Sequence, residues 1–108
     1  MGAVVGSFTP SGLFTDWVIT TMDVGDVAIA LPILALTGSN SIIIHNKSAT
    51  ETLYIGKSNV TADTVNGTTS GWEIPKNSYY ALDVKNNIVI YGRCETGKTV
   101  KVKIMELA

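Results

Sequence analysis

Residues 41–61 read SIIIHNKSATETLYIGKSNVT, and this stretch holds two short strand-like runs separated by a polar turn. The runs are Ser41 to Asn46 and Glu51 to Ile55. Apolar and polar side chains alternate in the second run, so we expect Leu53 and Ile55 to face a core and Tyr54 to face outward. The pattern predicts two half-buried strands joined as a hairpin.

Further runs with strand character lie on either side of this stretch. They are Thr15 to Val24, Val27 to Leu36, Trp72 to Pro75, Ser78 to Val84, Ile88 to Arg93 and Thr99 to Met105. The connection Asn86-Asn87 predicts another hairpin, because Asn tolerates the positive φ of tight turns. In the last run Val100, Val102 and Ile104 alternate with polar or longer side chains, which is typical of a strand with one buried face.

Turn clusters separate these runs at regular intervals, and no segment has helical periodicity. We therefore expect an all-β fold: a single antiparallel β-sandwich of about eight short strands, jelly-roll-like or immunoglobulin-like. A chain of 108 residues supports one hydrophobic core. Residues 1–14 mix Gly, Ser and isolated apolar residues, so we expect them to form an extended N-terminal arm, with the sandwich domain spanning residues 15–108.

The run from Val27 to Leu36 is the most apolar of the chain and carries no charge. A membrane helix needs roughly 20 residues, and Pro32 interrupts this run near its middle, so no membrane partner is expected. Two interpretations stay open. The run is either a strand buried on both faces and broken at Pro32, or a strand followed by an apolar loop that packs on a neighbouring subunit.

Composition narrows the class of partner. Hydrophobic residues make up 45% of the chain and charged residues only 16%, which favours burial of apolar surface against other subunits. The formal net charge of −1 provides no basic field for a phosphate backbone, so nucleic acid is not an expected partner. The first residues lack a basic region followed by a long apolar region, so we expect no secretory signal and synthesis in a cytoplasm.

Gly92 to Thr99 reads GRCETGKT and matches the phosphate-binding pattern G-x-x-x-x-G-K-[ST]. Such a loop binds phosphate at the N-terminus of a following helix, and the fold then supplies a metal-binding Asp from further strands. Here Thr99 opens a strand-like run, and only nine residues follow it. Nucleotide binding is therefore the least favoured interpretation, and we expect a β-turn instead.

Other chemistry-bearing residues form no recognisable constellation. His45 is the only histidine and Cys94 the only cysteine, which excludes an internal disulfide and a thiolate cluster within one chain. We expect no enzyme, no catalytic residue, no metal site and no cofactor. Trp72, Tyr79 and Tyr80 are candidates for an aromatic platform that stacks on sugars, although such residues also fill the cores and interfaces of β-sandwiches.

Six segments between Asn40 and Leu107 carry a resemblance to a known family. They read NSIIIHN, TLYIGKSNVT, GWEIP, SYYALDV, IVIYGR and KVKIMEL. Together they resemble the small β-sandwich virion proteins of tailed bacteriophages, which include capsid decoration, cement and head auxiliary proteins. In that family a strand ending in an Ile-Gly-x-x-x-Val-Thr turn precedes a Gly-containing loop, a short apolar-Pro segment and three more strands, and residues 55–61 match the turn.

The resemblance implies a virion structural protein rather than an enzyme. Such proteins bind the assembled capsid in many copies, as dimers or trimers on its outer surface, and bridge or stabilise shell subunits. The implied partners are the major capsid protein and the chain itself as a homo-oligomer. The implied location is the outer capsid surface of the virion, after synthesis in the host cytoplasm.

We expect the contacts with partners to lie in the N-terminal arm and the apolar run. The candidates are Phe8, Phe14, Trp17, Leu31, Ile33 and Leu34. The alternative function is a carbohydrate- or receptor-binding module of a phage tail fibre or baseplate. In that case the binding platform is formed by Trp72, Tyr79 and Tyr80.

Overall fold

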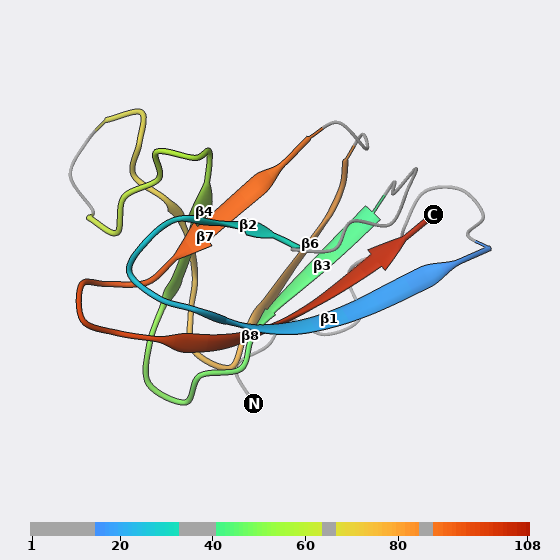
Figure 1. The fold of residues 1–108 in the computed structure, drawn as a ribbon, viewed down its shortest axis with the longest axis horizontal. Helices are drawn as coiled ribbons and strands as arrows, with labels where there is room; N and C mark the ends of the chain where they lie inside the picture. The colour runs from blue at the N-terminus through green and yellow to red at the C-terminus, as the bar shows by residue number, and fades with distance from the viewer. Residues whose placement is uncertain (1–14, 33–40, 64–66, 85–87) are drawn as a thin grey trace.

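The computed structural model describes residues 15–32, 41–63, 67–84 and 88–108, and within these ranges it contains eight strands and no helix (Figure 1). The strands are β1 (Trp17–Val24), β2 (Ile29–Leu31), β3 (Ser41–Asn46), β4 (Leu53–Gly56), β5 (Trp72–Ile74), β6 (Tyr79–Asp83), β7 (Ile90–Arg93) and β8 (Val100–Leu107). The predicted all-β class is confirmed. In the described part of the apolar run, residues 27–32, Ile29–Leu31 forms a strand that ends just before Pro32.

Two antiparallel sheets contain these described strands, in the orders β1-β8-β3-β6 and β2-β7-β4-β5. Strands pair symmetrically about the middle of the chain: β1 with β8, β2 with β7, β3 with β6 and β4 with β5. Figure 1 shows the first of these pairs, with β1 and β8 lying side by side. This nested order of eight strands is that of a jelly roll, so the structure selects the jelly-roll alternative of the predicted sandwich.

The predicted hairpin between β3 and β4 is wrong. β3 pairs with β6 and β8, whereas β4 pairs with β5 and β7, so the polar turn between β3 and β4 crosses from one sheet to the other. The hairpin predicted between β6 and β7 is wrong for the same reason, and its residues Asn86 and Asn87 lie outside the described ranges. Alternation shows which side chains face the core, but it does not identify the neighbouring strand.

The core lies between the inner faces of the two sheets. Its buried members are Met22, Val24, Leu31, Ile42, Ile44, Leu53, Ile55, Ile74, Cys94, Val100, Val102 and Ile104. The alternation predicted for the last run is confirmed, because Val100, Val102 and Ile104 are all buried. On β7, a Cβ added to Gly92 would lie 2.6 Å from Leu31 Cδ1, so glycine at this position allows β2 and β7 to pack closely.

Tyr54 differs from its predicted position facing solvent, because only 5% of its surface is exposed. The loop that follows β4 returns over this outer side of the second sheet. Val60 in that loop is 3% exposed, and a Cβ added to Gly71 would lie 2.6 Å from Tyr54 Cβ and 2.8 Å from Val60 Cγ2. The period-two pattern of β4 therefore places Tyr54 on the outer face, and the loop covers it there.

Asn46 ties the turn after β3 to the rest of the sandwich. Its side chain is fully buried, and Nδ2 donates hydrogen bonds to Glu51 O at 2.8 Å and to Ile74 O at 3.0 Å. Its Oδ1 accepts a hydrogen bond from the backbone N–H of Ser48 at 2.9 Å. One amide thus satisfies three backbone groups, two in the turn after β3 and one at the end of β5, which stabilises the crossing between the two sheets.

Candidate functional site

The outer face of the sheet β1-β8-β3-β6 is the side that points away from the second sheet, and it carries an unusual row of side chains. The register aligns Ile19 of β1, Met105 of β8, Ile43 of β3 and Ala81 of β6 across all four strands. We call these four residues the apolar row. Outer faces of antiparallel sandwiches are commonly polar, so a row that is apolar on every strand points to contact with another surface.

Two parallel rows flank the apolar row on the outer face. On one side lie Thr21, Lys103, His45 and Tyr79, which we call the basic row. On the other side lie Trp17, Leu107, Ser41 and Asp83, which we call the acidic row after its only charged member. Because side chains alternate along each strand, these three rows share one face and the core residues occupy the other.

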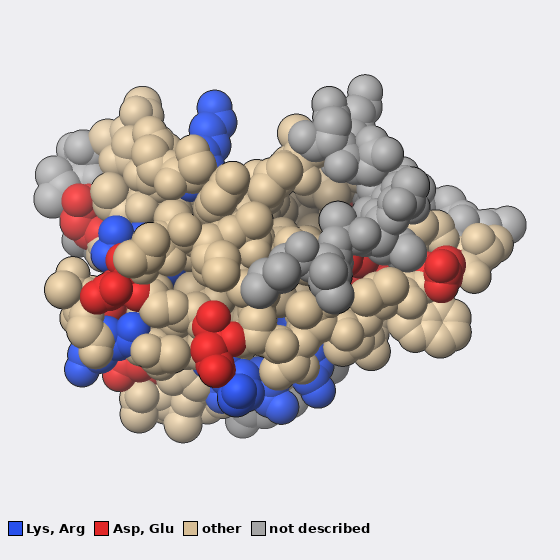
Figure 2. Space-filling view, viewed as in Figure 1, with Lys and Arg blue, Asp and Glu red and all other residues tan. Residues whose placement is uncertain are grey.

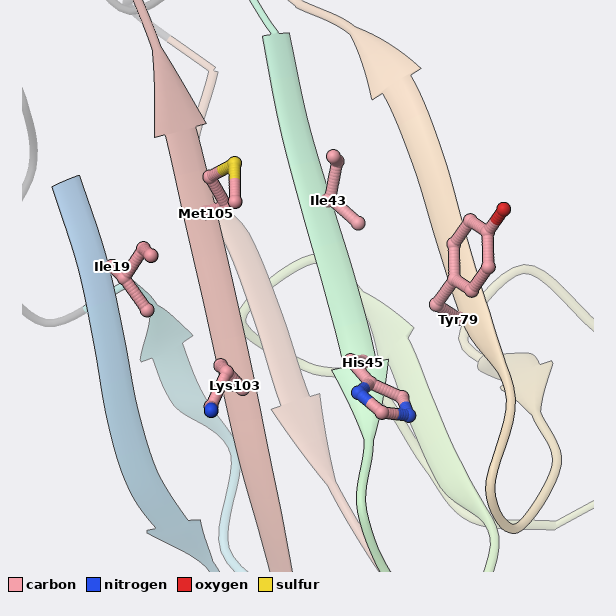
Figure 3. Close-up of a pocket in the computed structure, with 6 residues that line it drawn as sticks. All are labelled: Ile19, Ile43, His45, Tyr79, Lys103 and Met105. Atoms are coloured by element: carbon pink, nitrogen blue, oxygen red, sulfur yellow. The ribbon is translucent and has the colours of Figure 1, made fainter. Parts of the chain in front are cut away.

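A shallow cavity of about 320 Å³ lies between the apolar and basic rows. Its lining consists of Ile19, Ile43, His45, Tyr79, Lys103 and Met105. Figure 3 shows these side chains rising from four adjacent strands on the same side of the sheet, with the hydrocarbon groups of Ile19, Met105 and Ile43 next to one another. Most of this lining is apolar, so the hollow is suited to another apolar side chain rather than to a charged ligand.

Positive charge gathers at one end of the outer face. Burial lowers the pKa of His45 below its usual value, and the nearby charges of Lys47 and Lys103 lower the pKa further. Figure 2 shows Lys and Arg side chains along the lower margin of the molecule, next to β8. Lys101 Nζ contacts Asp23 Oδ1 at 2.9 Å, but both side chains are more than half exposed, at 57% and 66%, so this ion pair contributes little to stability.

The opposite end of the outer face carries negative charge. Asp83 ends β6 there, is exposed, and accepts a hydrogen bond from the hydroxyl of Ser41, its partner in the register. Ser41 is itself fully buried, so this hydrogen bond fixes the carboxylate against the sheet. The outer face is therefore polarised along its strands, with the apolar row between a basic end and an acidic end.

The structure separates the residues that were predicted to contact a partner. Trp17 lies on the outer face at the start of β1 and is 62% exposed, so it is available for contact. Leu31 is 2% exposed and packs in the core against β7, so its side chain is not available to a partner. Phe8, Phe14, Ile33 and Leu34 lie outside the described residues.

The predicted aromatic platform divides into two parts. Trp72 and Tyr80 are 64% and 38% exposed, and their ring centroids lie 6.0 Å apart with planes inclined at 36°. Tyr79 points to the opposite side of β6 and lines the cavity on the outer face. Because neighbouring residues of a strand face opposite ways, Tyr79 and Tyr80 do not share a surface.

The segment that matches a phosphate-binding loop is a β-turn. β7 ends at Arg93 and β8 begins at Val100, and the backbone N–H of Lys98 donates to Glu95 O at 2.9 Å. Cys94, inside this segment, is fully buried, and its thiol donates to Lys98 O at 2.8 Å. No helix follows Thr99 in residues 100–108, all of which are described, so the phosphate-binding geometry is not formed.

Burial raises the pKa of the Cys94 thiol, and the negative charge of Asp26 raises it further. No group of three or more His, Cys, Asp or Glu residues in the described ranges is placed to hold a metal ion. Across the same ranges, no helix is long and apolar enough to cross a bilayer.

Fold and surface together define an eight-stranded jelly-roll sandwich, counted over the described residues, with an apolar row across one outer sheet face. Comparison of the sequence with protein-family models and with curated proteins finds no match. The apolar row was not predicted from the sequence. Two features of the sequence indicate this row: the three consecutive residues Ile42, Ile43 and Ile44, and Met105, which follows two outward-facing lysines. Each places an apolar side chain at a position where alternation predicts a polar one.

Proposed function

We propose that this chain is a virion structural protein of a tailed bacteriophage that decorates the outer capsid surface and bridges or stabilises shell subunits. The observation that carries the proposal is the apolar row together with the exposed Trp17 on the same face, because exposed aromatic and aliphatic side chains ringed by charge are typical of protein-contact surfaces. The resemblance of residues 40–107 to phage decoration and auxiliary proteins supports the same role.

The chemistry of the surface supports a binding role over a catalytic one. His45 lies beside lysines and an apolar wall on the outer face, whereas the thiol of Cys94 is buried in the core, so the two groups lie on opposite sides of the sheet. Nucleophile and base pairs require contact within hydrogen-bond distance. The proposed partners are the major capsid protein and further copies of the chain, without nucleic acid, membrane or cofactor.

Co-sedimentation of the purified protein with capsids of the encoding phage tests this function. We expect binding, and we expect Trp17→Ala, Phe8→Ala and Phe14→Ala in the full chain each to weaken it by tenfold or more, as hot-spot aromatics do. Trp72→Ala is the matched control, since Trp72 is equally exposed but lies away from the outer face. Virions that lack the protein in electron micrographs, or capsids that do not retain it in the pellet, would contradict the proposal.

A second candidate function rests on Trp72 and Tyr80, whose exposed rings lie 6.0 Å apart. Two adjacent exposed aromatic rings offer apolar faces for the C–H groups of a sugar, as expected for a carbohydrate- or receptor-binding module of a tail fibre or baseplate. A glycan array, followed by tryptophan-fluorescence titration of any hit, tests it. Binding that persists in Trp72→Ala would remove these rings from consideration.

A further inference from the structure

The apolar row on the outer face is the feature of the described surface that most needs a partner. It crosses four paired strands, and Ile19 at one end is 51% exposed. We infer that a second copy of this chain packs on it face to face, with the two-fold axis of the dimer running along the row and therefore across the strands. This inference deepens the proposed function by assigning the apolar row to a second copy, while Trp17, at the corner of the face where β1 begins, remains for the shell. It rests on the proposed function only in treating the face as a protein contact.

Two-fold symmetry favours a contact of the apolar row with itself. In a two-fold dimer each patch meets the same patch on the other copy, so residues on the axis meet themselves. An axis along the row would place Met105 against Met105 and Ile43 against Ile43 of the second copy. These contacts are between apolar side chains of equal size, so the row is complementary to itself.

Charge favours the same axis. Rotation about the apolar row places the basic row of one copy over the acidic row of the other, so Lys103 lies over Leu107 and Tyr79 lies over Asp83. Lys103 thereby reaches the end of the face that carries Asp83, although the two residues are two strands apart. A two-fold axis parallel to the strands would instead keep each row over itself, with the Lys103 and Lys47 side chains of the two copies at the same end of the interface. Like charges placed together disfavour that arrangement, so electrostatics selects the axis that runs along the row.

The area of the face is close to what a dimer needs. β1 and β8 have eight residues each, β3 has six and β6 has five, so a rise of about 3.4 Å per residue and a strand spacing of about 4.8 Å give roughly 440 Å² per copy. Two such faces bury on the order of 900 Å², close to the roughly 1,000 Å² that a specific interface needs. The shallow cavity beside Ile43 and Met105 provides room for side chains of the second copy to interdigitate.

Sedimentation equilibrium of the full-length chain tests the inference in the absence of capsids. The chain mass is 11.5 kDa, and we expect twice this mass at micromolar concentration. Ile19→Lys and Met105→Lys place like charges on the axis, so each should raise the dissociation constant at least 100-fold. Ile19 is half-exposed, so its variant should fold, which circular dichroism will verify. Val27→Lys is the control: Val27 is 75% exposed and lies in the connection from β1 to β2, outside the strands of the face, so its variant should remain a dimer.

A short bis-maleimide locates the axis. Facing sheets lie about 10 Å apart, so Met105→Cys should cross-link to the same cysteine of the second copy. The two copies of Lys103→Cys would lie on opposite sides of the axis, about four residues apart along the strand and roughly 17 Å from each other, so they should not cross-link. Cys94 is buried and should not react. The inference would be overturned by the mass of one chain or of three chains, or by a dimer that survives both lysine substitutions. It would also be overturned if Lys103→Cys cross-linked instead of Met105→Cys. Capsid binding is measured separately, so a monomer that still binds capsids would refute the dimer and leave the proposed function standing.

Discussion

The buried amide of Asn46 offers the sharpest test of how the two sheets are joined. Asn46→Ala removes two hydrogen bonds donated to Glu51 O and Ile74 O, and one accepted from the N–H of Ser48. Each intramolecular hydrogen bond contributes about 1 kcal/mol, and leaving a buried partner unsatisfied costs more. We therefore expect Asn46→Ala to lower the free energy of unfolding by about 3 kcal/mol.

Urea unfolding followed by tryptophan fluorescence and by far-UV circular dichroism measures this loss. For a domain of this size 1 kcal/mol corresponds to roughly 4 °C in Tm, so the thermal midpoint should fall by about 12 °C. Asn46→Asp keeps the size and the acceptor but cannot donate at neutral pH, and it places a charge beside two carbonyl oxygens. Its destabilisation should therefore equal or exceed that of Asn46→Ala.

The control for this experiment is Asn59→Ala, because Asn59 is exposed in the loop after β4. We expect that variant to stay within about 0.5 kcal/mol of the unsubstituted protein. If Asn46→Ala were no less stable than Asn59→Ala, the three hydrogen bonds would not stabilise the crossing between β3 and β4, and the reasoning would be refuted.

Gly92→Ala adds a Cβ that would lie 2.6 Å from Leu31 Cδ1, so it should lower the free energy of unfolding, measured in urea, by about 1–3 kcal/mol. Leu31→Ala removes the side chain that this Cβ would meet, so the loss in the double variant should be smaller than the sum of the losses in the two single variants. His45 has a lowered pKa in the folded protein, where it faces Lys47, Lys103 and Tyr79. Its contribution to stability is therefore complete above the unfolded pKa of about 6.5 and is lost as the pH falls below that value. The free energy of unfolding measured from pH 7 to pH 5 should fall less steeply in His45→Gln than in the unsubstituted protein. The thiol of Cys94 is buried and its pKa is raised, so Ellman's reagent should label it slowly in the native protein and rapidly in urea, and rapid native labelling would contradict its placement in the core.

Strand positions were predictable because their signals are local. β8 shows this most clearly, since alternation along a single strand is enough to place Val100, Val102 and Ile104 in the core. Strand partners were not predictable, because a polar turn looks the same in sequence whether it joins neighbours in one sheet or crosses between sheets. The turn after Asn46 and the one after β6 were both read as hairpins for this reason.

The candidate surface was less accessible to sequence reasoning than the fold. Trp17 was identified from its residue type, whereas the apolar row depends on the register of β1, β8, β3 and β6, which no local pattern specifies. Tyr54 was expected outside because alternation cannot show that a distant loop carrying Val60 covers that side. Tyr79 and Tyr80 were grouped by adjacency, although neighbouring strand residues point to opposite faces.

The position of β8 in the nested strand order affects how the chain reaches its fold. β8 lies between β1 and β3, and in the described residues β1 pairs only with β8. During synthesis on the ribosome, β1 therefore has no strand partner until the last strand has emerged, and β3 keeps one open edge. Long-range pairing of this kind folds slowly, and unpaired edges are sites where chains join to one another. The newly made chain thus depends on Val100–Leu107 to close the sheet, and a truncation that removes this strand should yield aggregates rather than a smaller folded domain.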